Sequence, residues 1–431
     1  MAVSLEELRK ENEVLDIFCN LVTIPSPSLK EEKVIEWILD FCKENGIDGK
    51  TDAYGNVFIK VPATDSTKEP IMLSSHMDVV GDDSPINLVF DGEFIKADGR
   101  TLGADDKVGV ACALMLAKEL VNGLTPHPSL ASSRSLLKER GPVGHGGLEI
   151  TFTRDEETGM SGVEHVEFDK IDSKYILVCD ADKLGQLQIS GASYTNAKIT
   201  VRGLKGGHSG IDIGDETRLN AAKLIAELLA EFPQGAYYTD ETGVITSCNI
   251  GAIVAGGVQN SVASIVEKGI KTNDYISEIF KKTSTNIINT LGMASYSIRS
   301  ASIEKEEELK SLMQSIVDKF NKKYEGLATF EIEFEVHLLP FEKADDDRIE
   351  IAHTEACKRV GIQNKIESFH AGAETHIYCH NKNSKGETFM PSLLGLADVF
   401  NMHSASEKVD YKTLLIGYEI IKNTFLVFNE N

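Results

Sequence analysis

The chain has 431 residues, 42% of them hydrophobic, so it is long enough for two domains with sizeable cores. Its 44 basic and 67 acidic residues give a formal net charge of −23. This charge argues against binding to nucleic acid or to anionic membranes, because phosphate recognition needs clustered lysine and arginine. It suits a soluble cytoplasmic protein, in which clustered acidic residues can hold cations.

Over the first 186 residues, helix patterns alternate with strand patterns. Helices are expected at 5–22, 29–46 and 108–123, and strands at 56–62, 70–80, 148–153 and 175–182. The last of these strands is almost wholly apolar, which is typical of a sheet that is covered on both faces. The alternation predicts an α/β sandwich. The N-terminal segment lacks the apolar core of a secretory signal, and no apolar run is long enough for a membrane span.

From about residue 187 the pattern changes to that of a separate α+β domain. Strands are expected at 193–204, 243–254, 294–303 and 329–339, and helices at 218–232, 274–291 and 307–324. Helix patterns at 348–361 and 410–428 then indicate a return to the first domain. We therefore expect a catalytic domain over 1–186 and 339–431, with a second domain inserted at 187–338.

Two further features limit the interpretation. The seven cysteines are odd in number and scattered, and they contain no Cys-x-x-Cys pair, so reduced thiols are expected rather than disulfides or a cysteine-based zinc site. The segment 128–145 is rich in Ser, Pro and Gly and is locally basic, which predicts a surface loop.

Acidic residues and histidines gather where predicted strands end or helices begin. These groups are His76 with Asp78, Asp105 with Asp106, Glu156 with Glu157, Asp180 with Asp182, and His403. Taken singly, each group is more often a structural feature or a solvated turn. Taken together, they predict one site, because ligands bind at the carboxyl ends of the strands in α/β sheets.

The residue types at these ends point to metal ions. Imidazole and carboxylate groups suit zinc, cobalt or manganese. There are more acids than one ion needs, so we expect two ions and a bridging carboxylate. Two cations would also offset the repulsion among the adjacent acids at 155–157, where like charges raise one another's pKa.

Six motifs carry a resemblance to a known family. In chain order they are "SHMDVV", "TLGADDKVGVA", "TRDEETGMSG", "VCDAD", "GLKGGHSG" and "MHSASEKV". Together they resemble the co-catalytic di-zinc metallopeptidases that include peptidase T, aminoacyl-histidine dipeptidase (carnosinase-like) and aminoacylase. The resemblance covers nearly the whole chain except 128–145. It implies a mixed-sheet α/β/α catalytic domain of the zinc-exopeptidase type, with an inserted α+β lid or dimerisation domain.

The resemblance also implies a ligand set for two divalent ions, with zinc expected and cobalt or manganese as alternatives. Asp105 would bridge the ions, His76 and Asp180 would complete one site, and Glu157 and His403 would complete the other. The family usually has a cis peptide bond after the bridging aspartate, here Asp105–Asp106.

Two carboxylates close to the ligands receive other roles from the resemblance. Asp78 would orient His76 by accepting its second ring N–H. Glu156 would be the general base that takes a proton from the attacking water and passes it to the leaving amine.

The resemblance assigns substrate contacts as well. His208 would reach an active site, often that of the partner subunit, and stabilise the oxyanion. Without the resemblance, His208 would be interpreted as a surface loop histidine. Asn260 and Arg299 would bind the carboxylate end of a peptide. The alternative for Arg299 is a surface strand residue that faces outward. The segment "FHAGAE" resembles a glycine-rich substrate loop, with candidates His370, Gly372 and Glu374. His376 and His380 are spaced like a metal pair, but we read that spacing as incidental.

We therefore expect a metal-dependent exopeptidase that hydrolyses small unblocked peptides, namely dipeptides and especially the Xaa-His type. The segment 190–229 favours the aminoacyl-histidine dipeptidase branch, while "LGADDK" favours the tripeptidase branch because dipeptidases often carry Asn at position 106. An N-acyl amino acid deacylase or carboxypeptidase of the same family is a further alternative. A homodimer through the inserted domain is expected, with no nucleic acid or membrane partner. A scaffold that has lost its chemistry is disfavoured because every expected position is filled, and a calcium protein is disfavoured because EF-hand-like loops are absent.

Overall fold

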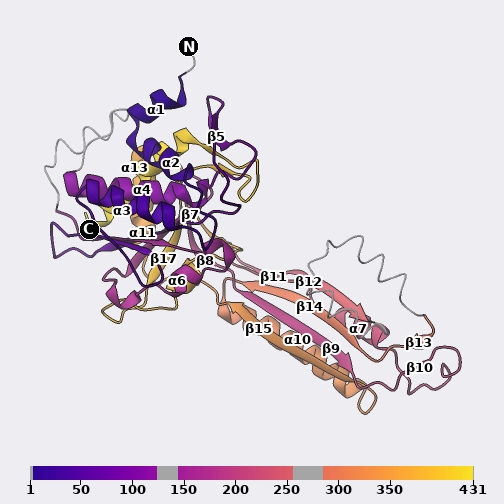
Figure 1. The fold of residues 1–431 in the computed structure, drawn as a ribbon. Helices are drawn as coiled ribbons and strands as arrows, with labels where there is room; N and C mark the ends of the chain where they lie inside the picture. Colours follow the sequence, from indigo (N-terminus) through magenta and orange to yellow (C-terminus); the bar gives the residue numbers. More distant parts are fainter. Residues whose placement is uncertain (1–2, 124–143, 256–284, 431) are drawn as a thin grey trace. The chain divides into compact units, whose positions relative to one another are not determined.

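The computed structural model describes residues 3–123, 144–255 and 285–430 (Figure 1). The chain forms two compact units. Unit 1 contains Met1–Gly191, Phe341–Ser368 and Gly372–Asn431, and unit 2 contains Ala192–Pro340 and Phe369–Ala371. Unit 1 is thus interrupted in sequence by unit 2. Asn260, nearly all of the segment 128–145 and most of the expected helix 274–291 lie outside the described residues.

Unit 1 is built on an eight-stranded mixed sheet. In spatial order its strands are β1 (Asp48–Thr51), β2 (Val57–Val61), β6 (Leu148–Thr153), β3 (Ile71–His76), β7 (Tyr175–Ala181), β17 (Met390–Gly395), β8 (Gln186–Gly191) and β16 (Lys365–Phe369). The four central strands β6, β3, β7 and β17 run parallel to one another. Their carboxyl ends therefore meet at one edge, and His76 pairs directly with Thr153, the last residue of β6.

Helices cover both faces of this sheet. The helices of unit 1 in the described residues are α1 (Leu5–Glu11), α2 (Glu13–Val22), α3 (Glu32–Glu44), α4 (Ala104–Asn122), α6 (Ser161–Glu164), α11 (Arg348–Val360), α12 (Thr375–Tyr378) and α13 (Tyr411–Phe428), with short 3-10 turns η1 (Glu156–Thr158) and η2 (Phe168–Lys170) (Figure 1). The first of them, α1, buries no residue and lies beside α2. On one face Ser74 bonds to Glu374 and Tyr378 at α12. On the other, the Oγ of Ser75 lies against Gly109 of α4. Adjacent strand residues point to opposite faces, so α4 and α12 cover opposite faces.

The expected helix 5–22 is two helices. Asn12 adopts an extended backbone conformation between α1 and α2. Its side-chain amide donates to the carbonyl oxygen of Leu8 at 2.9 Å and so satisfies the end of α1. Asparagine competes in this way for backbone groups, and the helix breaks at this point.

A smaller antiparallel sheet in unit 1 presents the last candidate ligand. Its strands in order are β18 (Val399–Phe400), β19 (Lys408–Asp410), β5 (Phe94–Ala97) and β4 (Leu88–Phe90). The loop between β18 and β19 carries both His403 and Glu407. β19 then leads directly into α13, where the side chain of Asp410 caps the helix by accepting the N–H of Lys412.

In its described residues, unit 2 contains a five-stranded antiparallel sheet with two helices on it. The strands in order are β11 (Gly235–Thr239), β12 (Ile245–Ala255), β14 (Gly292–Ser300), β9 (Tyr194–Arg202) and β15 (Thr329–Leu338), and the helices are α7 (Ala221–Leu229) and α10 (Ile303–Lys323). Alternate residues of β14, such as Tyr296 and Ile298, are buried in the core with α7 and α10. Arg299 lies on the opposite face of the sheet.

A two-stranded ribbon in unit 2 corrects one expectation. β10 (Gly207–His208) pairs with β13 (Ile287–Ile288), so residues 287–288 are a strand and the expected helix 274–291 does not extend through them. Two adjacent β-branched residues favour the extended backbone, and the partner strand outweighs the helical spacing. Among the described residues of the whole chain, no helix is long and apolar enough to cross a membrane.

Candidate metal centre

His76 ends the buried strand β3 and points its ring at acidic groups on both sides. Its Nε2 atom lies 3.1 Å from Oδ1 of Asp105 and 3.6 Å from Oδ1 of Asp180. Its Nδ1 atom lies 3.0 Å from the carbonyl oxygen of Asp78 and 3.4 Å from the carboxylate of the same residue. Burial lowers the pKa of His76, but the three neighbouring carboxylates outweigh it and hold the pKa well above the usual value. The ring is thus fixed on one side and aimed at two acids on the other.

Asp105 stands between the two imidazoles. Its Oδ1 atom faces His76, and its Oδ2 atom lies 3.1 Å from Nε2 of His403. Burial raises the pKa of Asp105, but the two histidines lower it far below its usual range. A carboxylate that gives one oxygen to each of two imidazoles has the arrangement of a bridge between two cation sites.

Glu157 joins the same group from the turn after β6. Its Oε1 atom lies 3.1 Å from Nε2 of His403. Ligand atoms of His76, Asp105 and Glu157 all lie within 4.8 Å of one another, which is close enough to hold a metal ion. The structure therefore brings together all five candidate ligands, with Asp180 beside His76 and Glu157 beside His403.

Asp106 and Asp182, the acidic neighbours of two of these residues, point elsewhere. Oδ1 of Asp106 accepts the N–H of Gly109 at 3.1 Å, and Oδ2 of Asp182 lies 3.8 Å from the amine of Lys183. The peptide bond between Asp105 and Asp106 is cis, as the resemblance implied.

The charge balance of the group fits divalent cations. Within the described part of the chain, Asp105, Asp180 and Glu157 form ion pairs only with His76 and His403, and no lysine or arginine offsets them. Burial and neighbouring carboxylates raise the pKa of Asp180 well above its usual value, and burial raises that of Glu157 to about 7. Three largely buried carboxylates with only two imidazoles to offset their charge are costly. Carboxylate and imidazole donors are also the ligands that zinc and similar ions prefer.

Glu156 sits beside the ligands without forming an ion pair to either imidazole. Burial raises its pKa to about 7, and the charges of Glu374, Glu157 and Asp105 act in the same direction against the opposing effect of His76. A carboxylate whose pKa lies near neutrality is suited to accept and release a proton. Divalent cations nearby would favour its charged form.

Asp78 holds the backbone of both glutamates. Its two carboxylate oxygens accept the N–H groups of Glu156 at 3.0 Å and Glu157 at 3.2 Å, and Ser28 donates its hydroxyl at 2.7 Å. Burial raises the pKa of Asp78, but these contacts and His76 lower it to about 2. Asp78 therefore positions Glu156, the candidate general base, in addition to orienting His76. The spacing of Asp78 from His76 in the sequence did not reveal its role toward Glu156.

Asp155, the first acid of the triplet, faces away from the ligands. Its φ of 55° is in the left-handed region, and its carboxylate accepts the N–H of Leu29 at 2.6 Å and the hydroxyl of Tyr54 at 2.8 Å. The three adjacent acids thus divide into one anchor, one candidate base and one candidate ligand. Such a division relieves the repulsion that three solvated neighbours would share.

Glu407 is a functional residue that sequence reasoning missed. It is fully buried, and its carboxylate accepts the N–H groups of Gly103 at 3.0 Å, Ala104 at 2.8 Å and Asp105 at 3.3 Å. The Glu407 side chain, from the loop that carries His403, therefore fixes the backbone that leads into Asp105. The only signal in the sequence was a glutamate four residues after His403.

In unit 2, two of the predicted substrate contacts lie together. The guanidinium of Arg299 stacks on the ring of Tyr194 at 4.8 Å. His370 lies 2.8 Å from the hydroxyl of Ser247 through Nε2, and burial together with the charge of Arg299 lowers its pKa. Within the described residues Arg299 forms no ion pair with a carboxylate. It remains a half-buried cation that can receive an anionic group.

The other substrate candidates are dispersed. Gly372 belongs to unit 1, and Glu374 is buried under β3, where Ser74 donates to it at 3.0 Å. His208 is exposed on β10 of unit 2. His376 is buried with Nδ1 2.9 Å from the carbonyl oxygen of Ala373, as expected of a structural histidine.

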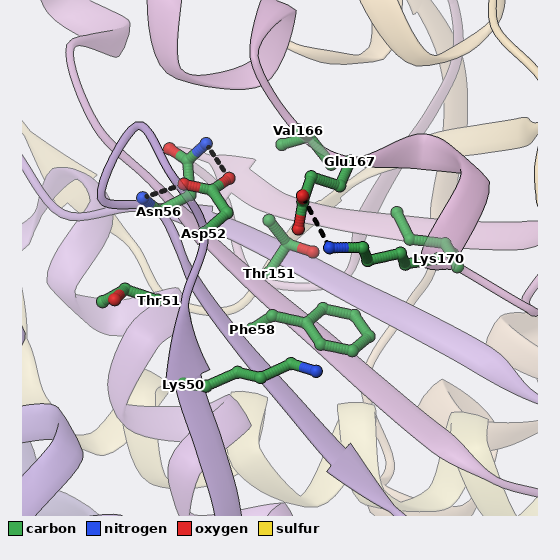
Figure 2. A pocket seen from close by; sticks show the side chains of 10 residues that line it. Lys50, Thr51, Asp52, Asn56, Phe58, Thr151, Val166, Glu167 and Lys170 are labelled. Atoms are coloured by element: carbon green, nitrogen blue, oxygen red, sulfur yellow. Dashed lines mark hydrogen bonds and ion pairs between the residues drawn. The ribbon is translucent and has the colours of Figure 1, made fainter.

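A separate hollow lies over β1, β2 and β6 in unit 1 (Figure 2). Its lining includes Phe58, and Nζ of Lys50 lies 5.8 Å from the centre of that ring. Lys170 pairs with Glu167 at 2.6 Å, and Asp52 accepts the amide of Asn56 at 2.8 Å. None of the candidate ligands or substrate contacts lines it.

Comparisons with known proteins place the chain among peptidases by sequence and by fold. The chain is 31% identical over 246 residues to the cytosol non-specific dipeptidase of Escherichia coli (strain K12), covering 50% of this chain and 46% of that protein. It therefore spans about half the length of that relative. Its fold matches the aminopeptidase PepT of Bacillus cereus over 99% of this chain and 100% of the other, with a TM-score of 0.74 at 21% identity. It also matches the YXEP protein of Bacillus subtilis, described as a dinuclear metal-binding peptidase, over 97% of this chain and 98% of the other, with a TM-score of 0.65 at 14% identity.

The family model described as peptidase family M20/M25/M40 matches residues 129–426, which is more than half of the chain. The matched region contains Glu156, Glu157, Asp180 and His403, while His76 and Asp105 precede it and meet these residues in the structure. The chain therefore belongs to peptidase family M20/M25/M40.

Proposed function

We propose that this protein is a metal-dependent exopeptidase that hydrolyses small unblocked peptides, in particular dipeptides of the Xaa-His type. The observation that carries the proposal is the position of Asp105, whose two carboxylate oxygens each lie 3.1 Å from Nε2 of a different histidine. This arrangement suits two cations that share one carboxylate.

The five candidate ligands would hold two divalent ions, for which we expect zinc. His76 and Asp180 would bind one ion, Glu157 and His403 the other, and Asp105 both. Ions bound there would supply Lewis acidity for the scissile carbonyl and lower the pKa of a nearby water.

The other residues of the site would transfer the proton and hold the reacting groups in position. Glu156 would take a proton from the attacking water onto its carboxylate and give it to the nitrogen of the leaving amine. Asp78 would keep Glu156 in place by accepting the backbone N–H of Glu156. Glu407 would do the same for the segment that leads into Asp105.

Two groups in unit 2 would recognise the substrate. Arg299 offers a guanidinium, stacked on Tyr194, that suits the free carboxylate end of a peptide. His208 would donate a hydrogen bond to the carbonyl oxygen that becomes an oxyanion. A homodimer in which unit 2 serves the partner subunit is part of the proposal, and sedimentation of the full chain would test it.

A second candidate is a tripeptide aminopeptidase of the peptidase T kind. The observation that favours it is Asp106 in "LGADDK", where dipeptidases of the resembling branch often carry asparagine. A deacylase would use the same ligands and differ in requiring a blocked amine.

One incubation separates these activities. Zinc-reconstituted protein is mixed with free dipeptides including Xaa-His, free tripeptides, and the same sequences N-acetylated, and the products are read by mass spectrometry. Cleavage of unblocked dipeptides with Xaa-His preferred supports the proposal. Cleavage of tripeptides at the first bond selects the aminopeptidase, and cleavage of acetylated compounds alone selects the deacylase. No cleavage with two ions bound would overturn the proposal of peptidase activity.

A further inference from the structure

His208 is an exposed side chain held in a tightly built turn of unit 2. Its Nδ1 atom accepts the backbone N–H of Gly210 at 3.1 Å and that of Ile211 at 3.2 Å. The other ring nitrogen, Nε2, has no hydrogen bond among the described residues. An exposed surface histidine would not need two backbone donors to fix its ring.

These two contacts select one form of the neutral ring. A nitrogen that accepts a hydrogen bond cannot carry the proton, so the proton of the neutral imidazole is on Nε2. Flipping the ring would place a carbon-bound hydrogen against the N–H groups of Gly210 and Ile211 and leave both without an acceptor. His208 therefore presents an N–H donor outward, and in this form it cannot accept a proton at Nε2.

Asp212 stabilises the turn that places the N–H groups of Gly210 and Ile211 against the His208 ring. Its Oδ2 atom accepts the backbone N–H of His208 at 2.8 Å, and its own N–H donates to the carbonyl oxygen of His208 at 2.9 Å. Arg218 supports the same loop by donating to the carbonyl oxygen of Gly206 at 2.6 Å. Its guanidinium also lies 3.8 Å from Oδ1 of Asp212.

Gly207 shows how closely the loop is packed at this point. A Cβ atom on Gly207 would lie 2.7 Å from Oδ2 of Asp212 and 3.0 Å from Nη1 of Arg218, and its φ is +142°. The glycine before His208 is therefore required by the position of the Asp212 carboxylate. In the sequence "GGHSGID", Gly207 leaves the space that the Asp212 carboxylate needs to bond to the backbone of His208.

We propose that Asp212 is a positioning residue that locks His208 as the Nε2–H form, so that His208 acts as a hydrogen-bond donor to a carbonyl oxygen and not as a base. The inference deepens the proposed function and rests on it for the identity of that oxygen, a peptide carbonyl. The form of the ring itself does not depend on the activity. It can be measured in protein that turns over no substrate.

The test is nitrogen NMR of the full-length protein labelled with ¹⁵N in its histidine rings, in which the two neutral forms give different patterns. His208→Gln identifies the signals of His208. In the wild type, the pattern expected is a protonated Nε2 and an unprotonated Nδ1. Asp212→Ala and Gly207→Ala should add signals of the other form, whereas Asp212→Asn keeps an acceptor oxygen and should retain the wild-type pattern. Glu216→Gln, an exposed acid of the same loop, is the charge-matched control and should change nothing.

Kinetics on an unblocked dipeptide give the second readout. His208→Ala should lower kcat by about 100-fold to 1,000-fold, as for a lost oxyanion donor, with metal content unchanged. Asp212→Ala should lower kcat by at least about tenfold, as for a misplaced catalytic group. The double variant should be no slower than His208→Ala alone, because Asp212 acts through His208.

The two readouts separate the possible failures. A proton on Nδ1 in the wild type, or an unchanged pattern in both Asp212→Ala and Gly207→Ala, overturns the inference about Asp212. The expected nitrogen patterns together with normal turnover of His208→Ala uphold the positioning by Asp212 and contradict the oxyanion role in the proposed function.

Discussion

Nε2 of His403 lies 3.1 Å from Oδ2 of Asp105, although 298 residues separate the two in the chain. The other oxygen of the same carboxylate faces His76. Asp105 is therefore the point at which the two halves of the candidate metal centre meet. Replacing Asp105 should affect both ions, whereas replacing an outer ligand should affect one.

Asp105→Ala is expected to lose both ions on dialysis against metal-free buffer, and Asp180→Ala is expected to lose one. The reason is that Asp105 faces both imidazoles and Asp180 lies beside His76 alone. Elemental analysis of the dialysed proteins measures this directly. One tightly retained ion in Asp105→Ala would mean that the carboxylate is not shared.

Glu156→Gln should keep both ions and lose turnover by about 100-fold to 10,000-fold, the range for a removed general acid or base. The substitution removes a proton acceptor and preserves the shape of the side chain. The matched control is Glu164→Gln, an exposed acid in the next helix, which should keep normal kcat. A near-normal rate in metal-loaded Glu156→Gln would assign the proton transfer to another group.

Glu407→Ala should destabilise the protein by about 3 kcal/mol or more. The change leaves two buried N–H groups and one partly buried N–H group without their acceptor, and an unsatisfied buried group costs about 1–3 kcal/mol. Glu407→Gln keeps one acceptor oxygen and should lose less. Urea unfolding of the two variants gives the comparison, and wild-type stability in Glu407→Ala would remove Glu407 from the support of Asp105.

Arg299→Ala should raise KM for a free dipeptide by about 10-fold to 100-fold, in line with about 1.5–3 kcal/mol for a hydrogen bond to a charged group. It should have little effect on the same peptide with an amidated carboxyl end, because the amide lacks the charge. Arg202→Ala is the control, since Arg202 is exposed and already paired with Glu331. Equal effects on free and amidated peptides would show that Arg299 does not bind the carboxylate.

Metal-free protein should lose stability as the pH rises from about 4.5 to about 7. Burial raises the pKa of Glu157 from 4.5 in an unperturbed side chain to about 7, so the native state binds this proton more tightly than the unfolded state. The pKa of His403, raised to about 9 chiefly by the hydrogen bond to Asp105, gives a loss of the same sign at higher pH. Asp78, with its pKa lowered to about 2, is already fully charged in this range.

Urea unfolding at pH 5 and pH 8 measures this loss. It should be smaller in metal-free Glu157→Gln than in the wild type, because the substitution removes the titrating carboxyl. Added zinc should cancel or reverse the loss in the wild type, since cations favour the charged carboxylates. Equal losses in the wild type and Glu157→Gln would show that Glu157 does not govern the pH dependence.

The arrangement of the candidate ligands could be expected from the sequence because one physical rule gathers them. His76 and Asp180 lie at the carboxyl ends of parallel strands and Glu157 follows a third, so positions far apart in the chain become neighbours. The membership of the family and the mixed-sheet fold with an α+β insertion are confirmed by the comparisons. The roles of the individual residues remain predictions for the experiments above.

Other features depend on contacts that have no local pattern. Glu407 looks like a solvated loop residue until the chain brings it under the backbone of residues 103–105. Asp155 reads as one more acid of a triplet, yet its side chain turns to Tyr54. Ile287 and Ile288 fit a helical spacing, but pairing with β10 makes them a strand. In each case the deciding partner comes from a distant part of the sequence.

The central claim is that Asp105 is shared by two ions, and electron paramagnetic resonance of protein loaded with two Mn²⁺ tests it most directly. Ions bridged by one carboxylate interact magnetically, so the spectrum should show a coupled pair that becomes a single isolated ion in Asp180→Ala. Two independent, uncoupled Mn²⁺ signals in the wild type would contradict the shared site and the mechanism built on it.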